Sequence, residues 1–365
     1  MTRRQLWLRI IEHLDLPLLA GMGLLMLASL LTLYSASDHN LDRVLAQGAN
    51  ILVALVCLWV VANLPLHYLM RTAVPIYVVG MLLLIGVALF GEISHGSRRW
   101  LNIGVATIQP SELMKIGVPL MMAWYFEKHE AGLTLKNYIV AALLLLMPVA
   151  LIARQPDLGT ALLISASGFY VLFLAGLSWR VMGGLFVAGI ASAPLLWSMM
   201  HDYQRHRIEM LFDPSQDALG KGYHTIQGMI AVGSGGIFGK GYLNGTQTHL
   251  DFLPERTTDF IFAVYSEEFG MVGNLILLAM YFFVIARGFV ITANASTYFT
   301  RLMAGSITLT FATYAFVNMG MVSGILPIVG VPLPLVSYGG TSMLTLLLGF
   351  GMLMSIQTHK KLVKS

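Results

Sequence analysis

Three stretches of this chain, residues 16–34, 48–66 and 72–90, contain no charged side chain. An α-helix rises 1.5 Å per residue, so about 20 apolar residues cross the ~30 Å hydrocarbon core of a bilayer. Within lipid the backbone must satisfy its own hydrogen bonds, and helices are the structure that lets such runs do so. The three stretches therefore predict membrane-spanning helices.

The remainder of the chain has the same character. Of its 365 residues, 57% are hydrophobic and 11% are charged, whereas a soluble domain carries roughly 25% charged residues. We therefore predict an all-α membrane protein, a single polytopic membrane domain over residues 1–365 with about ten transmembrane helices. The further predicted spans are residues 110–126, 137–153, 158–179, 181–200, 259–286, 302–325 and 336–357.

Basic residues are distributed unevenly between the two sides of the predicted bundle. With the N-terminus inside, twelve fall at inner ends and loops and four in short outer loops. Cytoplasmic loops carry the excess of Lys and Arg, so this orientation places both termini in the cytoplasm. The inner set is Arg3, Arg4, Arg9, Arg71, Lys128, Lys136, Arg180, Arg287, Arg301, Lys360, Lys361 and Lys364; the outer set is Arg43, Arg98, Arg99 and Arg154.

Residues 201–258 separate the seventh and eighth predicted helices and lie outside in this orientation. Structureless connections longer than about 15 residues are uncommon. Apolar residues such as Tyr223, Ile226 and Phe252 are interspersed among the polar ones. We expect a large folded extracytoplasmic loop that packs onto the membrane domain.

Several other kinds of site are excluded by pattern. The glycine-rich stretch 234–241 lacks the first glycine and the Ser or Thr of a phosphate-binding loop. The loop histidines have no zinc-binding spacing. The single cysteine, Cys57, rules out an intrachain disulfide. A net charge of +4 is too small to indicate a nucleic-acid partner.

Two charged residues lie inside the predicted fourth helix. Glu112 and Lys115 are three residues apart, so they share one helix face and can pair. A lysine this deep in an apolar span costs several kcal/mol unless it is paired or hydrated. Asp157, before the sixth helix, fits a helix cap as well as it fits a site.

Asp259 opens the predicted eighth helix beside the cations of the outer loops, among them Arg205, Arg207 and Arg256. A carboxylate among arginines at a lipid interface indicates a site for an anionic, lipid-linked substrate. The alternative is a solvated loop with surface salt bridges.

A series of motifs in a fixed order resembles the SEDS family (shape, elongation, division, sporulation), and within it the members of the rod-elongation machinery. The resemblance runs from about Leu16 to the C-terminus. The chain departs from the family pattern where Thr257 and Thr258 replace a histidine followed by a threonine. The motifs lie at 109–115, 155–160, 203–207, 245–247, 252–263 and 332–340.

This resemblance implies a peptidoglycan glycosyltransferase of the bacterial inner membrane with its active site on the periplasmic face. Its substrate would be lipid II, a disaccharide-peptide on undecaprenyl pyrophosphate. Its partner would be a class B penicillin-binding protein of the elongation machinery, a transpeptidase. The family's essential aspartate matches Asp259, and its conserved glutamate and lysine match Glu112 and Lys115.

The predicted mechanism makes Asp259 the general base for an attacking sugar hydroxyl. Cations must meet the charge that develops on the leaving pyrophosphate. We expect inversion at the anomeric carbon, because no second carboxylate is placed as a nucleophile. A divalent cation such as Mg²⁺ or Mn²⁺ is compatible with this chemistry, but no pattern assigns it a site. The candidate substrate-binding residues are Glu112, Lys115, Arg98, Arg205, Arg207, Arg256, Thr257 and Ser337.

Two other functions remain open at this point. A lipid II flippase could use intramembrane charges such as Glu267 and Glu268 to line a polar path. The polar motifs gather at one face, however, and the sequence lacks a convincing inverted repeat. A pure scaffold for the elongation complex would leave the charged cluster without a role.

Overall fold

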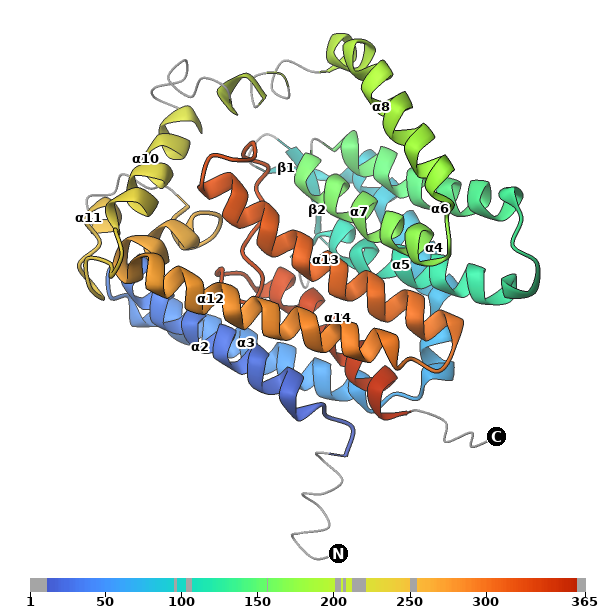
Figure 1. The fold of residues 1–365 in the computed structure, drawn as a ribbon, viewed down its shortest axis with the longest axis horizontal. Coiled ribbons are helices and arrows are strands. Elements are labelled where there is room, and N and C mark those ends of the chain that lie inside the picture. Colours follow the sequence, from blue (N-terminus) through green and yellow to red (C-terminus); the bar gives the residue numbers. More distant parts are fainter. Residues whose placement is uncertain are drawn as a thin grey trace, which may run out of the picture.

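The computed structural model describes residues 12–94, 97–102, 107–155, 157–200, 205, 208–211, 221–249 and 255–359. They form an almost entirely helical protein (Figure 1). Each predicted span overlaps one long helix. These helices are α2 (Leu16–Ala36), α3 (Leu41–Ala62), α4 (Leu66–Phe90), α5 (Pro110–Lys128), α6 (Leu135–Ala153), α7 (Leu158–Leu174), α8 (Trp179–Met199), α12 (Ile261–Ala293), α13 (Tyr298–Val322) and α14 (Gly340–Thr358).

Seven helices within the described residues are long and apolar enough to cross a membrane: α2, α3, α4, α6, α12, α13 and α14. The apolar α7 is shorter, as is the apolar part of α8, Trp179–Leu195. Helix α5 carries charges in its first and last turns. The predicted helical membrane protein is confirmed, and the number of ten spans stays a prediction.

The long helices pack side by side. Helix α14 packs along α3, α2 along α12, and α13 along both α12 and α7. Helices α5, α7 and α12 begin at the same end of the bundle, which we call the "loop end". Helices α10 and α11 lie beside it on the left of Figure 1. At the opposite end the first and last described segments meet. There the rings of His13 and His359 stack with their centroids 4.3 Å apart.

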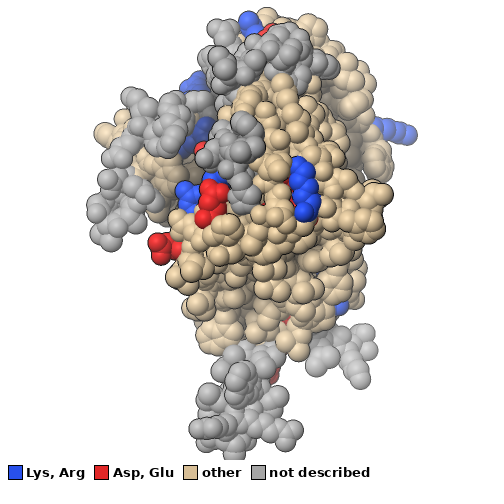
Figure 2. Space-filling view, turned by 90° about the vertical axis from the view of Figure 1, so that its left-hand side faces the viewer, with Lys and Arg blue, Asp and Glu red and all other residues tan. Residues whose placement is uncertain are grey.

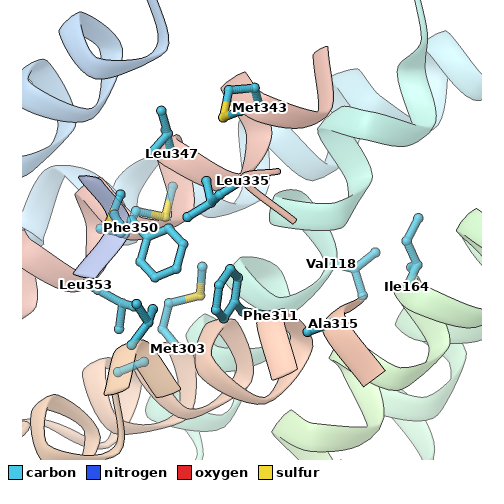
Figure 3. Packing of buried hydrophobic residues seen from close by; sticks show 14 of the residues in the cluster. Val118, Ile164, Met303, Phe311, Ala315, Leu335, Met343, Leu347, Phe350 and Leu353 are labelled. Carbon is cyan, nitrogen blue, oxygen red and sulfur yellow. The ribbon is translucent and has the colours of Figure 1, made fainter. Parts of the chain in front are cut away.

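The core extends through the bundle, and part of it lies where α5, α7, α13 and α14 meet (Figure 3). Val118, Ile164, Phe311 and Phe350, one from each helix, are buried. The rings of Phe311 and Phe350 meet edge to face with centroids 5.0 Å apart. Large apolar side chains also cover the outside, where Leu82 is 62% exposed. An apolar exterior of this kind suits lipid, which solvates it without cost.

A small antiparallel sheet, absent from the sequence-based prediction, lies between α4 and α5. Its strands are β1 (Glu92–Ser94), β2 (Ser97–Asn102) and β3 (Thr107–Ile108), in the order β1-β2-β3. Glu92 pairs with Trp100, and Leu101 pairs with Ile108. Strands of two to six residues carry too short an alternation to be detected by pattern.

Helix α12 differs from its prediction in both its ends and its continuity. It covers Ile261–Ala293 rather than 259–286, and it breaks at Gly270, where φ is +63°. The predicted length already exceeded the hydrocarbon core, so the first turns had to protrude or bend; the structure shows a break. Helix α14 begins at Gly340 rather than 336, and α3 at Leu41 rather than 48, because Asn40 caps it.

The glycine-rich segment 235–241 repairs the break in α12. Its backbone forms two pairs of hydrogen bonds, before and after Gly270, and the Met271 N–H donates to the Gly236 carbonyl at 2.9 Å. The contact is so close that a Cβ on Gly270 would lie 2.2 Å from the Gly239 nitrogen. The stretch that superficially resembles a phosphate-binding loop therefore joins two halves of a helix.

The loop between α8 and α12 folds onto the bundle in its described part. It contains α10 (Lys221–Ser234) and α11 (Thr246–His249), and α10 packs against α12. The buried Glu267 carboxylate of α12 accepts from Lys240 Nζ at 2.6 Å and from the Thr246 backbone N–H at 2.9 Å. Glu267 thus anchors this loop.

Candidate active site

A polar cavity of about 140 Å³ lies at the loop end, between the first turns of α5, α7 and α14. The segment 330–332, between α13 and α14, forms one of its walls. Two cations and two carboxylates line it. Its charged lining residues are Arg99, Glu112, Lys115 and Asp157.

The predicted pair on α5 forms at this cavity. Pro110 is the first residue of the helix, where its missing N–H costs nothing. One turn later Lys115 Nζ lies 2.5 Å from Glu112 Oε1, and the two side chains are 9% and 12% exposed. The ammonium also lies 5.4 Å from the ring centre of Tyr314 on α13. A buried lysine is tolerated here because a carboxylate and an aromatic face surround it.

Asp157 combines the two roles left open by its sequence. Its carboxylate caps α7 by accepting from the Thr160 N–H at 3.3 Å. It also accepts from Gln109 Nε2 at 3.0 Å and lies 3.9 Å from Arg99 Nη1. Asp157 therefore fixes the position of Arg99 in the cavity wall. Arg99 is a functional candidate that is absent from the site residues predicted above, which include its neighbour Arg98 instead.

Asp259 lies in the turn before α12, two residues ahead of the first helical residue. The prediction that it opens the helix is wrong; Phe260 occupies the capping position and no side chain caps it. Asp259 Oδ2 lies 3.5 Å from the position of a Cβ on Gly330, whose φ is +73°. Since Gly330 lines the cavity, the carboxylate adjoins it.

Hydrogen bonds from α13 and from the segment before α14 hold the turn around Asp259 in place. Asn318 of α13 donates through Nδ2 to the carbonyls of Asp259 and Val331, at 2.8 and 2.7 Å. Ser337 Oγ donates to the Thr258 carbonyl at 2.6 Å. The fully buried Asn318 was missed, since a single amide in an apolar helix has no motif around it.

The other predicted residues are placed less directly. Ser337 and the buried Thr257 join the turn before α12 to the segment before α14. The Tyr338 N–H donates to the Thr257 carbonyl at 2.9 Å. Arg256 forms an ion pair with Asp38. Arg205 donates to the carbonyls of Trp197 and Ser198 at the end of α8 and does not line the cavity.

Two predicted cations fall outside the described atoms. Arg207 lies outside the described residues, as does the side chain of Arg98.

Figure 2 views the left-hand side of Figure 1 and shows acidic and basic side chains close together on a mostly uncharged surface.

A resident metal finds little support in the described residues. Within them, no group of three His, Cys, Asp or Glu side chains converges to hold an ion. The second oxygen of Glu112, Oε2, is buried and has no hydrogen-bond partner among the described residues. One orphaned carboxylate oxygen does not make a cation site, but it can accept a hydrogen bond from a substrate hydroxyl.

Comparisons with known proteins give one consistent family. A family model described as a cell cycle protein, FtsW/RodA/SpoVE, matches residues 12–362. The peptidoglycan glycosyltransferase MrdB of Escherichia coli is 50% identical over 352 residues, covering 96% of this chain and 95% of that protein.

Solved structures agree. A chain from a peptidoglycan synthase complex, described as coordinating polymerization and crosslinking, has a TM-score of 0.82 at 29% identity, covering 96% of this chain and 99% of that one. The rod shape determining protein RodA of Thermus thermophilus has a TM-score of 0.71 at 29% identity, covering 94% and 96%. The chain therefore belongs to the FtsW/RodA/SpoVE family of cell cycle proteins, the SEDS family that its motifs resemble.

Proposed function

We propose that this chain polymerises lipid II into glycan strands during cell elongation, with the polar cavity at the loop end as its active site. Its activity as a peptidoglycan glycosyltransferase follows from half-identical relatives of that name that match it over nearly their whole length. The observation that carries the site is a polar cavity lined by Lys115 and Arg99, with the Asp259 carboxylate next to Gly330, another of its lining residues.

In the proposed reaction the 4-hydroxyl of one sugar attacks the anomeric carbon of a lipid-linked donor. A new carbon–oxygen bond forms as the bond to the pyrophosphate breaks, and the leaving group keeps the electron pair. Asp259 accepts the hydroxyl proton, a role typically worth about 10²–10⁴ in rate. A single attacking oxygen and a single displacement invert the anomeric centre.

The cations of the cavity stabilise the leaving pyrophosphate. Lys115 and Arg99 are held before the reaction by Glu112 and Asp157. Preorganised charge of this kind requires no reorganisation as the leaving group develops its own charge. Glu112 keeps the ammonium charged and in position, and its Oε2 is placed to accept a substrate hydroxyl.

The proposed setting is the bacterial inner membrane with both termini in the cytoplasm and the cavity on the periplasmic side. The excess of basic residues at the opposite end supports this orientation. A class B penicillin-binding protein would crosslink the strands made here. Support comes from the structural match to a chain of a synthase complex that couples polymerization and crosslinking.

The flippase alternative has lost one of its supports. Glu267 binds Lys240 and the start of α11, so it anchors a loop rather than lining a path.

The decisive experiment replaces Asp259 with Asn and measures glycan synthesis from labelled lipid II in detergent, where flipping has no meaning. Asparagine keeps the size and the backbone contacts of the turn but cannot act as a base. We expect Asp259→Asn to accumulate normally, to bind its partner and to make no glycan. Polymerisation above about a tenth of the wild-type rate would exclude Asp259 as the base, because that loss is below the smallest expected for a general base.

A further inference from the structure

Below the cavity, an apolar groove runs along the faces of three helices. It begins at Lys115 and continues past Ile116 and Pro119 on α5. Phe311 on α13 and Phe350 on α14 also line it; both are buried, and their rings pack together in Figure 3.

The groove has the length of about one membrane leaflet. Along α13 it extends from Tyr314 to Met303, which at 1.5 Å per residue is roughly 17 Å. Half of a ~30 Å hydrocarbon core is about the same length. Ile307 and Leu346 at its edges are only half-buried, so it opens along one side. Its enclosed free space of about 50 Å³ is too small to hold a chain, so a chain bound here would lie along the open side of the groove.

Two hydroxyls along the groove already have partners within the protein. Ser306 donates to the Ser167 carbonyl at 2.8 Å, and Thr345 donates to the Thr341 carbonyl at 2.9 Å. A third, Thr310 Oγ1, is buried and has no hydrogen-bond partner among the described residues. Apart from this hydroxyl and the Lys115 end, a ligand in the groove meets mainly a hydrocarbon surface. Apolar chains are the ligands that such a surface holds.

Lys115 belongs to both the polar cavity and the apolar groove. A ligand whose anionic group contacts this ammonium has its adjoining chain at the start of the groove. The leaving pyrophosphate of the donor is directly attached to a polyprenyl chain, and it is the donor whose pyrophosphate gains charge in the reaction.

We propose that the groove between α5, α13 and α14 holds the polyprenyl chain of the donor lipid II while Lys115 binds its pyrophosphate. This inference rests on the proposed function and assigns the donor to one side of the cavity. The acceptor, whose pyrophosphate takes no part in the bond exchange, has no need of Lys115.

Photocrosslinking locates the chain without relying on turnover. The purified full-length protein is irradiated with lipid II that carries a diazirine in the isoprene unit next to the pyrophosphate. Labelled peptides should come from α5, α13 and α14 around Ile116, Phe311 and Leu346. Labelling confined to other helices would refute the assignment. The control is a phosphatidylglycerol that carries the same diazirine. If it labels these peptides equally and excess lipid II does not displace it, the groove is an ordinary lipid contact and the assignment is refuted.

A matched pair of variants at Gly349 tests the groove in catalysis. A Cβ at Gly349 would meet Ile307 Cγ2 at 3.4 Å, an ordinary contact, so Gly349→Ala should be tolerated. The larger Gly349→Leu side chain should displace part of the chain and raise KM for full-length lipid II about tenfold relative to Gly349→Ala. The kcat should change little, and a substrate with a short polyprenyl chain should be affected less.

The outcomes separate the two proposals. An unchanged KM in correctly folded Gly349→Leu would overturn the groove assignment and leave the polymerase function intact. If Gly349→Leu fails to fold, Thr310→Leu, on the same groove, takes its place. Absence of polymerisation by wild-type protein would overturn the function, whereas crosslinking would still report where the chain binds.

Discussion

At the scale of single residues, Asn318 joins the parts of the site that come from distant sequence. Its amide donates to the carbonyls of Asp259 and Val331 and so ties the turn before α12 to the wall of the cavity. The residue touches no reacting atom in the proposed mechanism, and its role is to position Asp259.

Replacing Asn318 with Leu should lower polymerisation at least tenfold while the protein still enters the membrane. Two buried carbonyls would lose their donor, at a cost of about 1–3 kcal/mol each. The control is Thr308→Val on the same helix, which removes a buried bond to the Ala304 carbonyl without touching the loop. Steady-state rates and thermal unfolding of both variants decide the matter. Equal losses of rate would show that Asn318 acts through general stability.

The pair of Glu112 and Lys115 makes a second prediction at this scale. Lys115→Met leaves a buried carboxylate unpaired, which should destabilise the protein by about 3–5 kcal/mol. Adding Glu112→Gln should restore most of the stability but no polymerisation, because the cation for the leaving group is still missing. Lys115→Arg should rescue poorly, since a planar fork does not replace a compact ammonium. Glycan synthesis by the stable double variant would show that Glu112 and Lys115 have only a structural role.

At the scale of elements, α12 consists of two helices that meet at Gly270, and the backbone of segment 235–241 forms hydrogen bonds to both of them. The turn that carries Asp259 therefore lies at the start of a short, fully buried half-helix. Every residue from Ile261 to Glu268 is buried, so this half has little freedom to move. The loop beyond α10 thus contributes directly to the rigidity of the site.

Gly270→Ala should destabilise the protein markedly and abolish polymerisation. The methyl group would lie 2.2 Å from the Gly239 nitrogen, and φ at +63° disfavours any side chain. Gly48→Ala on α3 is the matched control, because a Cβ there meets nothing within 4 Å. It should leave stability unchanged or raise it by up to ~1 kcal/mol. Thermal unfolding monitored by size-exclusion chromatography compares the two variants. Similar unfolding temperatures would contradict the close backbone contact between Gly270 and segment 235–241.

The positions of the long helices could be predicted from the sequence, but most of the contacts between them could not. Runs such as 16–34 determine helices because lipid permits little else. The pairing of Glu112 with Lys115 was predictable because it is local to one helix face. The break at Gly270 was not, since it depends on backbone hydrogen bonds between residues that lie 27 or 35 positions apart in the chain, as Lys240 and Glu267 or Gly236 and Met271 do. The same holds for Asn318, whose partners lie on two other segments.

At the scale of the whole molecule, the orientation in the membrane is the prediction that the fold leaves open. A reporter that is active only outside the cytoplasm should work when inserted near Gln216 and fail after Lys364. The reason is the excess of basic residues at the end opposite the cavity. Reporter activity at the C-terminus would reverse the orientation or change the number of spans.

The rings of His13 and His359 stack with their centroids 4.3 Å apart, so the first and last described segments of the bundle lie next to each other. Segments that lie this close can be joined by a linker, and the chain can then be opened at another loop. A short linker from residue 359 to residue 13, with new ends opened between α12 and α13, would keep every helix in its present direction. Such a rearranged chain should insert and polymerise, which would show that the bundle depends on the cyclic order of its helices rather than on which is made first.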